Sequence, residues 1–212
     1  MKSSGQFFAA VLMGMIGATA TAAHVDLNDP RRAVGREGNV RVDAQLTQDT
    51  LSANSALTVT YQIENLTSST IAVADKVVDT DFDPDSRTIT LSIGAEIPPG
   101  PNMPHLVVIK SGEKRTLNAG ALVHVTLPDI RTPWTAVPRY VQVKVTVLKD
   151  VMAFAPLIEQ QNHNMMPIAL PDSMFERWVE GSESVLLNSV PVYWRGESRR
   201  GTAESNQPAG TD

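Results

Sequence analysis

Histidines carry the most specific chemistry that this sequence offers. If the chain is cut after Ala23, His24 becomes its first residue, and the α-amine and imidazole of that residue can chelate one copper ion together. A second imidazole would complete a brace of three nitrogens, and imidazole is a ligand that suits copper. His105 and His163 stand in segments that we expect to be loops, so either one is a candidate for the second imidazole.

Methionines accompany two of these histidines. Met103 and Met165 are each two residues from a histidine, and thioether sulfur selects Cu(I). The sequence therefore offers a copper-binding hypothesis that uses His24, His105, His163, Met103 and Met165. With its N-terminal histidine and export signal, the chain resembles the exported copper proteins that bind through an N-terminal histidine brace, such as lytic polysaccharide monooxygenases and periplasmic copper carriers. The alternative is a chance histidine beside the cut and methionines that fill gaps in the core.

Aspartates gather between positions 75 and 85 and form a second candidate site. The spacing of Asp79, Asp81 and Asp83 is similar to the start of an EF-hand calcium loop. That loop requires Gly at its sixth position and Glu at its twelfth, where this chain has Pro84 and Thr90. Two readings stay open: a cation site of another type at Asp79, Asp81 and Asp83, and a solvated acidic turn that protects a sheet edge from aggregation.

Known catalytic motifs are absent from the sequence. It contains no Gly-rich phosphate loop, no His-Glu-x-x-His and no Gly-x-Ser-x-Gly. The segment from Ser111 to Lys114 matches the Ser-x-x-Lys pattern of some hydrolases. Those enzymes carry the pattern on a helix, whereas Gly112 and Glu113 here predict a hairpin turn. We therefore expect no catalytic residues and a protein that is not an enzyme.

The first 23 residues predict export. Lys2 supplies a positive start, and the apolar run from Phe7 to Ala18 is shorter than the roughly 20 residues that cross a bilayer. Small residues follow and allow cleavage after Ala22 or Ala23. The sequence thus predicts a periplasmic or secreted protein, with no membrane span after cleavage.

Composition narrows the classes of partner. The chain has 212 residues, with 18 basic and 23 acidic side chains and a net charge of −5. Nucleic acid binding needs concentrated positive charge, so we expect no nucleic acid partner and instead a protein or another component of the cell envelope. There is no cysteine, which excludes disulfides and thiolate metal ligands. We expect no cofactor outside the copper and calcium hypotheses.

Alternating apolar residues dominate the middle of the chain and predict sheets with one buried face. The clearest strand should bury Leu57, Val59, Tyr61 and Ile63, and similar alternation covers 40–46, 89–93 and 141–147. One helix is predicted near 172–180, capped by Asp172 or Ser173. Turns are predicted at 110–113 and 118–120, among others.

The predicted organisation has four parts: a signal peptide at 1–23, an irregular N-terminal arm at 24–38, a β-sandwich domain at 39–194 and a disordered polar tail at 195–212. The segment from Leu57 to Val73, LTVTYQIENLTSSTIAV, contains an alternating strand, an Asn-containing turn and a second apolar stretch. It resembles a pair of strands in bacterial exported immunoglobulin-like domains. The likeness extends over 40–148 and implies an all-β, antiparallel immunoglobulin-like sandwich, with one short helix near the C-terminus.

Function does not follow from such a fold, so three hypotheses stay open. The first is a non-enzymatic binding or interaction module. The second is a periplasmic copper-binding protein that uses His24. The third is a chaperone-like or protease-inhibitor-like sandwich that acts through an exposed strand edge.

Overall fold

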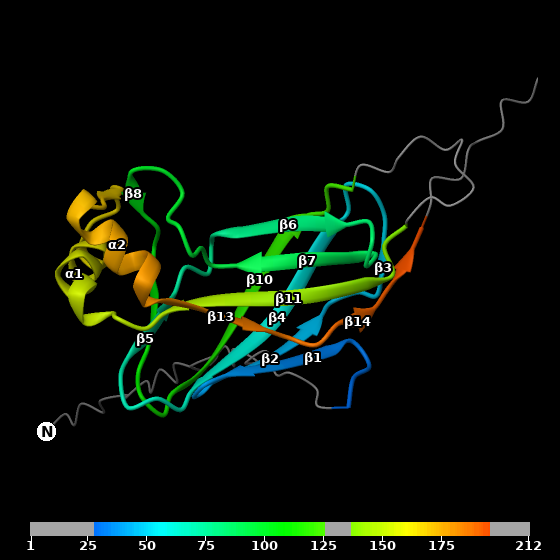
Figure 1. Cartoon of the computed structure of the whole chain (residues 1–212), viewed down its shortest axis with the longest axis horizontal. Helices are drawn as coiled ribbons and strands as arrows, with labels where there is room; N and C mark the ends of the chain where they lie inside the picture. Colours follow the sequence, from blue (N-terminus) through cyan, green and yellow to red (C-terminus); the bar gives the residue numbers. More distant parts are fainter. Residues whose placement is uncertain (1–27, 126–136, 196–212) are drawn as a thin grey trace, which may run out of the picture.

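Alternating apolar side chains build the two main sheets of the molecule. The computed structural model describes residues 28–125 and 137–195, which Figure 1 shows in colour. In β4 (Ala56–Asn65), the exposed Thr58 lies between buried neighbours. The buried side chains are those predicted from the alternation, namely Leu57, Val59, Tyr61 and Ile63. The predicted burial of this strand is therefore confirmed.

One sheet has four antiparallel strands in the order β1-β2-β4-β10. The other three strands of this sheet are β1 (Arg32–Glu37), β2 (Val40–Leu46) and β10 (Lys114–Leu122). The prediction of an irregular arm at 24–38 is wrong for the part that forms β1, which pairs with β2 along its whole length. Gly35 in this strand allows a close approach, because a Cβ there would lie 2.6 Å from the carbonyl oxygen of Leu186.

The second sheet has seven strands and runs β6-β7-β11-β5-β9, with β13 and β14 also paired to β11. The parallel pair is β7 with β11, and the other pairs are antiparallel. Its strands are β5 (Ile71–Val73), β6 (Val78–Asp83), β7 (Thr88–Ile93), β9 (Val107–Ile109), β11 (Tyr140–Leu148), β13 (Ser182–Leu186) and β14 (Val190–Pro191). Figure 1 shows β10 and β4 running obliquely behind β6, β7 and β11.

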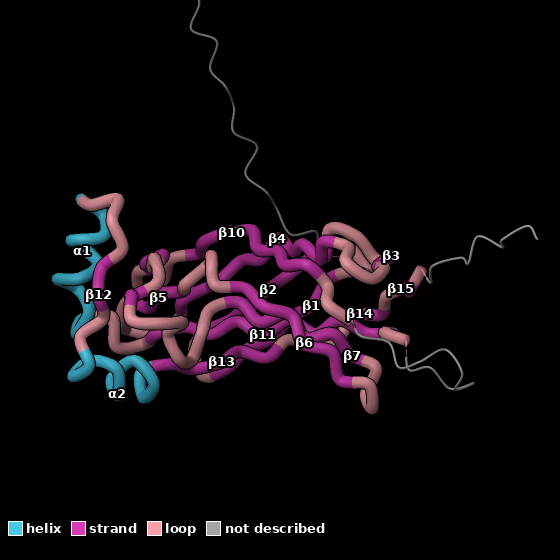
Figure 2. Tube along the Cα trace, turned by 90° about the horizontal axis from the view of Figure 1, so that it is seen from above, coloured by secondary structure: helices cyan, strands magenta, loops and turns pink. Residues whose placement is uncertain are grey.

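Short ribbons and helices complete the chain. β8 (Asn102–Met103) pairs with β12 (Ile168–Ala169), and β3 (Thr50–Leu51) pairs with β15 (Tyr193–Trp194). The helices are a 3₁₀ turn, η1 (Met152–Phe154), followed by α1 (Ala155–His163) and α2 (Asp172–Gly181). Figures 1 and 2 place α1 and α2 together at one end of the sheets.

The two helices differ in how far the sequence predicts them. α2 lies where a helix was predicted, and its Trp178 is buried. Its cap differs from the prediction, since the N-cap is Pro171 and no side chain makes a capping bond. α1 was not predicted. It lacks a side-chain cap and buries Ile158 alone, so the proline in its first turn and His163 in its last turn are the signals that mark it in the sequence.

Two hydrophobic clusters stabilise these elements. The larger fills the space between the sheets and includes the buried residues of β2, β4, β7 and β11. The smaller lies beneath the helices and packs Phe154 edge-to-face on Trp178, with ring centroids 5.5 Å apart. The helices therefore close one end of the sandwich by burying aromatic surface of their own.

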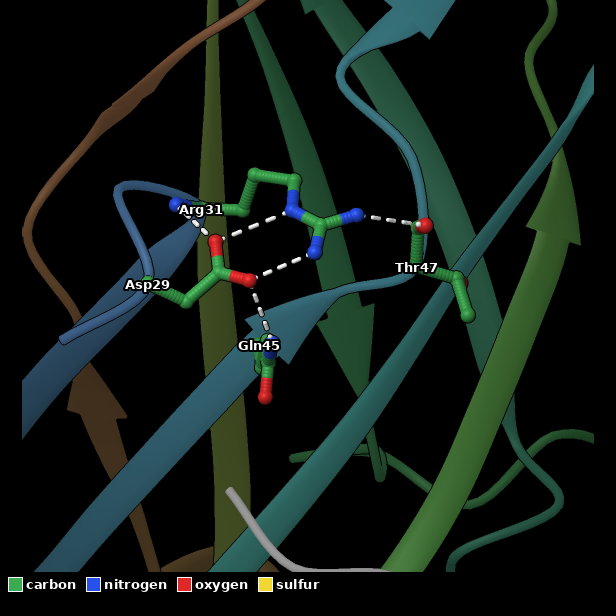
Figure 3. Close-up of polar contacts among 4 residues, drawn as sticks. All are labelled: Asp29, Arg31, Gln45 and Thr47. Atoms are coloured by element: carbon green, nitrogen blue, oxygen red, sulfur yellow. Dashed lines mark hydrogen bonds and ion pairs between the residues drawn. The ribbon is translucent and has the colours of Figure 1, made fainter. Parts of the chain in front are cut away.

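An ion-pair clasp fixes the chain just before β1 (Figure 3). Asp29 accepts hydrogen bonds from the Arg31 backbone at 2.7 Å, from Arg31 Nε at 2.9 Å and from Gln45 Nε2 at 2.7 Å. Arg31 Nη1 donates to the carbonyl oxygen of Thr47 at 2.9 Å. The Arg31 side chain, and next its backbone N–H, hold the pKa of Asp29 well below its ordinary value of 3.8. The clasp thus ties residues 29–31 to the end of the β2 strand, at Gln45, and to Thr47 just after it.

The architecture confirms the predicted all-β fold with face-to-face sheets and a helix near the C-terminus. In residues 28–125 and 137–195, no helix has the length and apolarity that a membrane crossing requires. The predicted signal peptide and the tail after Arg195 lie outside the described residues.

Candidate functional site

The two sheets meet at a seam, which we define as the facing edges of β6 (Val78–Asp83) and β10 (Lys114–Leu122). Each of these strands is the last one of its sheet on that side. The hydrogen bond found across the seam within the described residues runs from Thr80 Oγ1 to the carbonyl oxygen of Leu122, at 2.8 Å. No backbone ladder joins the two strands there. The sandwich is therefore tied at one end of the seam and unpaired along the rest.

The backbone of β10 has an identifiable open side. Val123 N–H donates to the carbonyl oxygen of Ser55 at 2.9 Å, and Asn65 N–H donates to the carbonyl oxygen of Glu113 at 3.0 Å. Antiparallel pairing alternates, so the odd-numbered residues of β10 bond to β4 and the even-numbered ones direct N–H and C=O away from it. The bond from Thr80 to the even-numbered Leu122 agrees with this register.

Three residues on that open side have no backbone partner within the described residues: Thr116, Asn118 and Gly120. The sequence had predicted a turn at 118–120, and that prediction is wrong because this segment pairs with β4 through Asn118↔Thr60 and Gly120↔Thr58. From Thr116 to Leu122 the strand carries neither charge nor proline. Such an edge is a template for the addition of another strand.

Two other edges of the sheets, at β1 and β6, are protected. β1 lies against the segment after β13, where Asn188 N–H donates to the carbonyl oxygen of Val34 at 3.0 Å and Asn188 Oδ1 accepts from Val34 N–H at 2.6 Å. β6 carries exposed aspartates at alternate positions. Charges on an edge strand discourage pairing with another chain, whereas the end of β10 has none. The contrast with β1 and β6 marks β10 as a long edge that is available for pairing.

A cavity of about 360 Å³ lies beside the seam. Its wall on the β4 and β10 side includes Thr58, Thr60, Asn118 and Gly120. Its wall on the other side is formed by Asp75, Lys76 and Val78, which lead into β6. Cavities of this size hold small ligands or a few side chains. The open stretch of β10 and the cavity thus share Asn118 and Gly120.

Asp75 is the most unusual residue of this cavity. It is 5% exposed, and its Oδ2 lies 3.1 Å from Lys76 Nζ. Its Oδ1 is buried and has no hydrogen-bond partner among the described residues. Tyr61 is fully buried, and its hydroxyl likewise lacks a partner in the described part of the chain. Burial raises the pKa of Tyr61, and the negative charge of Asp75 raises it further.

The structure brings the two histidine and methionine segments side by side but does not gather their side chains. β8 pairs with β12 through Met103↔Ile168, and Gln161 Nε2 donates to the carbonyl oxygens of Met103 and Pro104. Met103 is 3% exposed, in the smaller core, whereas Met165 is fully exposed. His105 and His163 are also exposed, and His24 lies outside the described residues. The copper hypothesis therefore stays a prediction.

The acidic candidate proves to be a strand rather than a loop. Asp79, Asp81 and Asp83 alternate along β6 and are exposed. Asp83 accepts hydrogen bonds from Ser86 Oγ at 2.6 Å and from Asp85 N–H at 3.0 Å, and the first of these is the main cause of its lowered pKa. Across residues 28–125 and 137–195 there is no cluster of three or more His, Cys, Asp or Glu side chains that could hold a metal. The reading as edge protection describes these aspartates better than the reading as a loop site.

Sequence reasoning missed the seam, although two signals for it exist. Leu117, Ala119 and Ala121 alternate with polar or glycine positions and so mark a strand with a lightly buried face. Asp75 follows four apolar residues, all of them buried, which is an unusual place for a carboxylate.

Comparisons with protein families, curated proteins and solved structures found no match to this chain.

Proposed function

We propose that this protein is a non-enzymatic binding module that accepts an extended polypeptide segment of another protein as an added strand on β10. The observation that carries the proposal is the uncharged, unpaired edge at Thr116, Asn118 and Gly120, beside a cavity lined by two of these residues. Strand addition uses main-chain hydrogen bonds for affinity and a neighbouring pocket for specificity. The seam supplies both elements.

A single strand fits this edge better than a second copy of the whole sheet. Neighbouring strands lie about 4.8 Å apart, so one extended segment needs little lateral space. β6 already stands beside the end of β10, where Thr80 bonds to Leu122. A second sheet continuing from β10 would have to pass β6 at that point. We therefore favour a flexible or extended guest segment over self-association.

The experiment selects ligands from a phage-displayed library of random nonapeptides on the full-length protein and then measures the affinity of synthetic copies by calorimetry. Asn118→Pro removes an edge N–H without removing a backbone hydrogen bond to β4, because the backbone N–H of Asn118 points away from β4. Asn118→Ala is the matched control. Both variants lose the hydrogen bond from Thr60 Oγ1 to Asn118 Oδ1, at 2.8 Å, but only the proline changes the backbone.

We expect selected peptides to bind the wild type and Asn118→Ala with similar affinity and to bind Asn118→Pro at least tenfold more weakly. Amide NMR signals of Thr116, Asn118 and Gly120 should shift on binding. Equal binding to Asn118→Pro, with its circular dichroism unchanged, would reject the proposal. A stable dimer in light scattering that Asn118→Pro dissolves would identify a second copy as the occupant and would also count against it.

Export is the second part of the proposed function. The support is the sequence of residues 1–23, with a positive start, a short apolar run and small residues before His24. The partner would then be a protein or another component of the cell envelope, met in the periplasm or outside the cell. Expression in a bacterial host followed by N-terminal sequencing tests this. Cleavage near Ala23 supports export, and a retained Met1 contradicts it.

A further inference from the structure

The hydrophobic core is incompletely closed along the seam. In β2 and β4, the apolar side chains that face the core are at most 2% exposed. In β10, the apolar side chains that pack against the same core are only half-buried, namely Leu117, Ala119 and Ala121. Across the seam, Val78 and Phe82 of β6 are also half-buried against this core. Both walls of the seam thus leave apolar surface in contact with water, which favours its burial by another segment.

The two faces of β10 differ in character. Leu117 and Ala119 pack against the core, whereas Thr116 and Asn118 carry polar side chains on the face that points away from it. On that outer face, Thr60 Oγ1 donates to Asn118 Oδ1 at 2.8 Å. Directly opposite residues of neighbouring strands place their side chains on the same face of a sheet. A strand added to β10 would therefore point alternate side chains at the core, opposite Leu117 and Ala119, and the intervening ones at solvent.

Resting on the strand-addition function proposed above, we propose that the guest segment is an amphipathic strand whose apolar side chains complete the core at the seam. These side chains occupy two guest positions, two residues apart, that lie opposite Leu117 and Ala119. The position opposite Ala121 is excluded, because Thr80 of β6 already bonds to the adjacent Leu122. Main-chain pairing is available to a guest of almost any sequence, so the apolar side chains supply the selectivity.

The guest position opposite Ala119 should favour a large apolar side chain. Ala119 and Val78, from opposite sides of the seam, both line the cavity of about 360 Å³. The methyl group of Ala119 fills little of this space, and protein interiors gain stability when such space is filled to close packing. A leucine, isoleucine, methionine or phenylalanine of the guest can therefore enter beside Ala119, where serine or a charged residue would bury a polar group among apolar ones.

The test uses the nonapeptides selected on the full-length protein. Each residue of a binding peptide is replaced by serine, one at a time, and the affinity for the wild type is measured by calorimetry. Two positions, two residues apart, should each lose about tenfold or more, because each replacement removes a buried apolar side chain. The position between them and the position on either side should lose less than about threefold. This scan uses only the wild-type protein, so it does not depend on the folding of any variant.

Ala119→Leu gives a second readout, because it fills the space from the host side. Peptides with a large residue opposite position 119 should bind this variant about tenfold more weakly than the wild type, and shortening that residue to alanine should restore binding to within about threefold. Thr116→Leu adds the same side chain to the outer face of β10 and is the matched control, which should keep the preference for a large residue.

Two results would overturn this inference and leave strand addition intact. One is a set of peptides that Asn118→Pro weakens but that show no pair of apolar positions two residues apart. The other is a size preference that Ala119→Leu leaves unchanged. Peptides that bind Asn118→Pro as well as the wild type would instead reject strand addition itself.

Discussion

Replacing Tyr61 by phenylalanine is expected to stabilise the protein, although Tyr61 is a fully buried core residue. The ring packs in the larger hydrophobic cluster, and phenylalanine keeps that packing. The hydroxyl is the part that lacks a hydrogen-bond partner within the described residues. A buried polar group without a partner costs roughly 1 to 3 kcal/mol, so removing it should raise the free energy of unfolding by about 1 to 2 kcal/mol.

The pH dependence of the free energy of unfolding tests the same prediction in a second, independent way. Burial, and then the charge of Asp75, raise the pKa of Tyr61 in the folded state above its ordinary value of 10.0. Between the unfolded and folded pKa values, the unfolded state releases the phenolic proton and the folded state keeps it. The wild type should therefore lose stability above pH 10, by up to about 1.4 kcal/mol for each pH unit, and Tyr61→Phe should not share this loss.

The assay is urea denaturation followed by tryptophan fluorescence at pH 7 and pH 11, for the wild type, Tyr61→Phe and the control Tyr193→Phe. Tyr193 is 71% exposed, so loss of its hydroxyl should change stability by less than about 0.5 kcal/mol. A gain of 1 to 2 kcal/mol corresponds to a rise in melting temperature of about 2 to 8 °C for a domain of this size. The reasoning fails if Tyr61→Phe is less stable than the wild type at pH 7, or if the difference between them does not widen at pH 11.

Three further predictions follow from other parts of the molecule. Asn65→Ala should lower the free energy of unfolding by about 2 to 4 kcal/mol in the same urea assay. The reason is that the fully buried Asn65 side-chain amide donates hydrogen bonds to the carbonyl oxygens of Ser69, at 2.8 Å, and Ile109, at 3.0 Å. Arg31→Met should return the pKa of Asp29 toward 3.8, measured by carbon NMR of the carboxyl group. The stabilisation given by a depressed folded pKa is present above the unfolded value and is lost as pH falls through the folded one. The wild type should therefore be more stable than this variant at pH 7, and the difference between them should shrink as the pH is lowered below 3.8. The copper hypothesis predicts that mature protein beginning at His24 binds one equivalent of Cu(II) and that one added residue before His24 abolishes binding; equal metal content in both forms would contradict it.

The sequence predicts those strands of this fold that bury one face of side chains and expose the other to solvent. β4 is the clearest case, because each apolar residue of its alternation is buried against the opposite sheet. β1 escaped prediction because Gly35 reads as a break, whereas the glycine is needed where β13 passes close by. The need for that contact arises from residues about 150 positions away along the chain, and no local pattern records it.

That the edge at β10 is open could not be predicted, for a related reason. An open edge is defined by which strands fail to pair, and that depends on the order of the strands rather than on any one of them. Asn118 and Gly120 favour turns locally, but pairing with β4 overrides that preference. The unpaired oxygen of Asp75 likewise depends on what surrounds the carboxylate in space. The sequence shows the acidic residue, and only the structure shows that its partner is missing.

The central place of β11 has a consequence for the order in which the chain folds during synthesis. β11 joins the β6–β7 pair to the β5–β9 pair, and it is made after all four of these strands. Until residues 140–148 emerge, the two pairs have no common neighbour in the second sheet. Closing such distant contacts is slow compared with forming local ones. A nascent chain of this topology therefore stays loosely folded until most of it has been made, which is the state that the export proposed above requires.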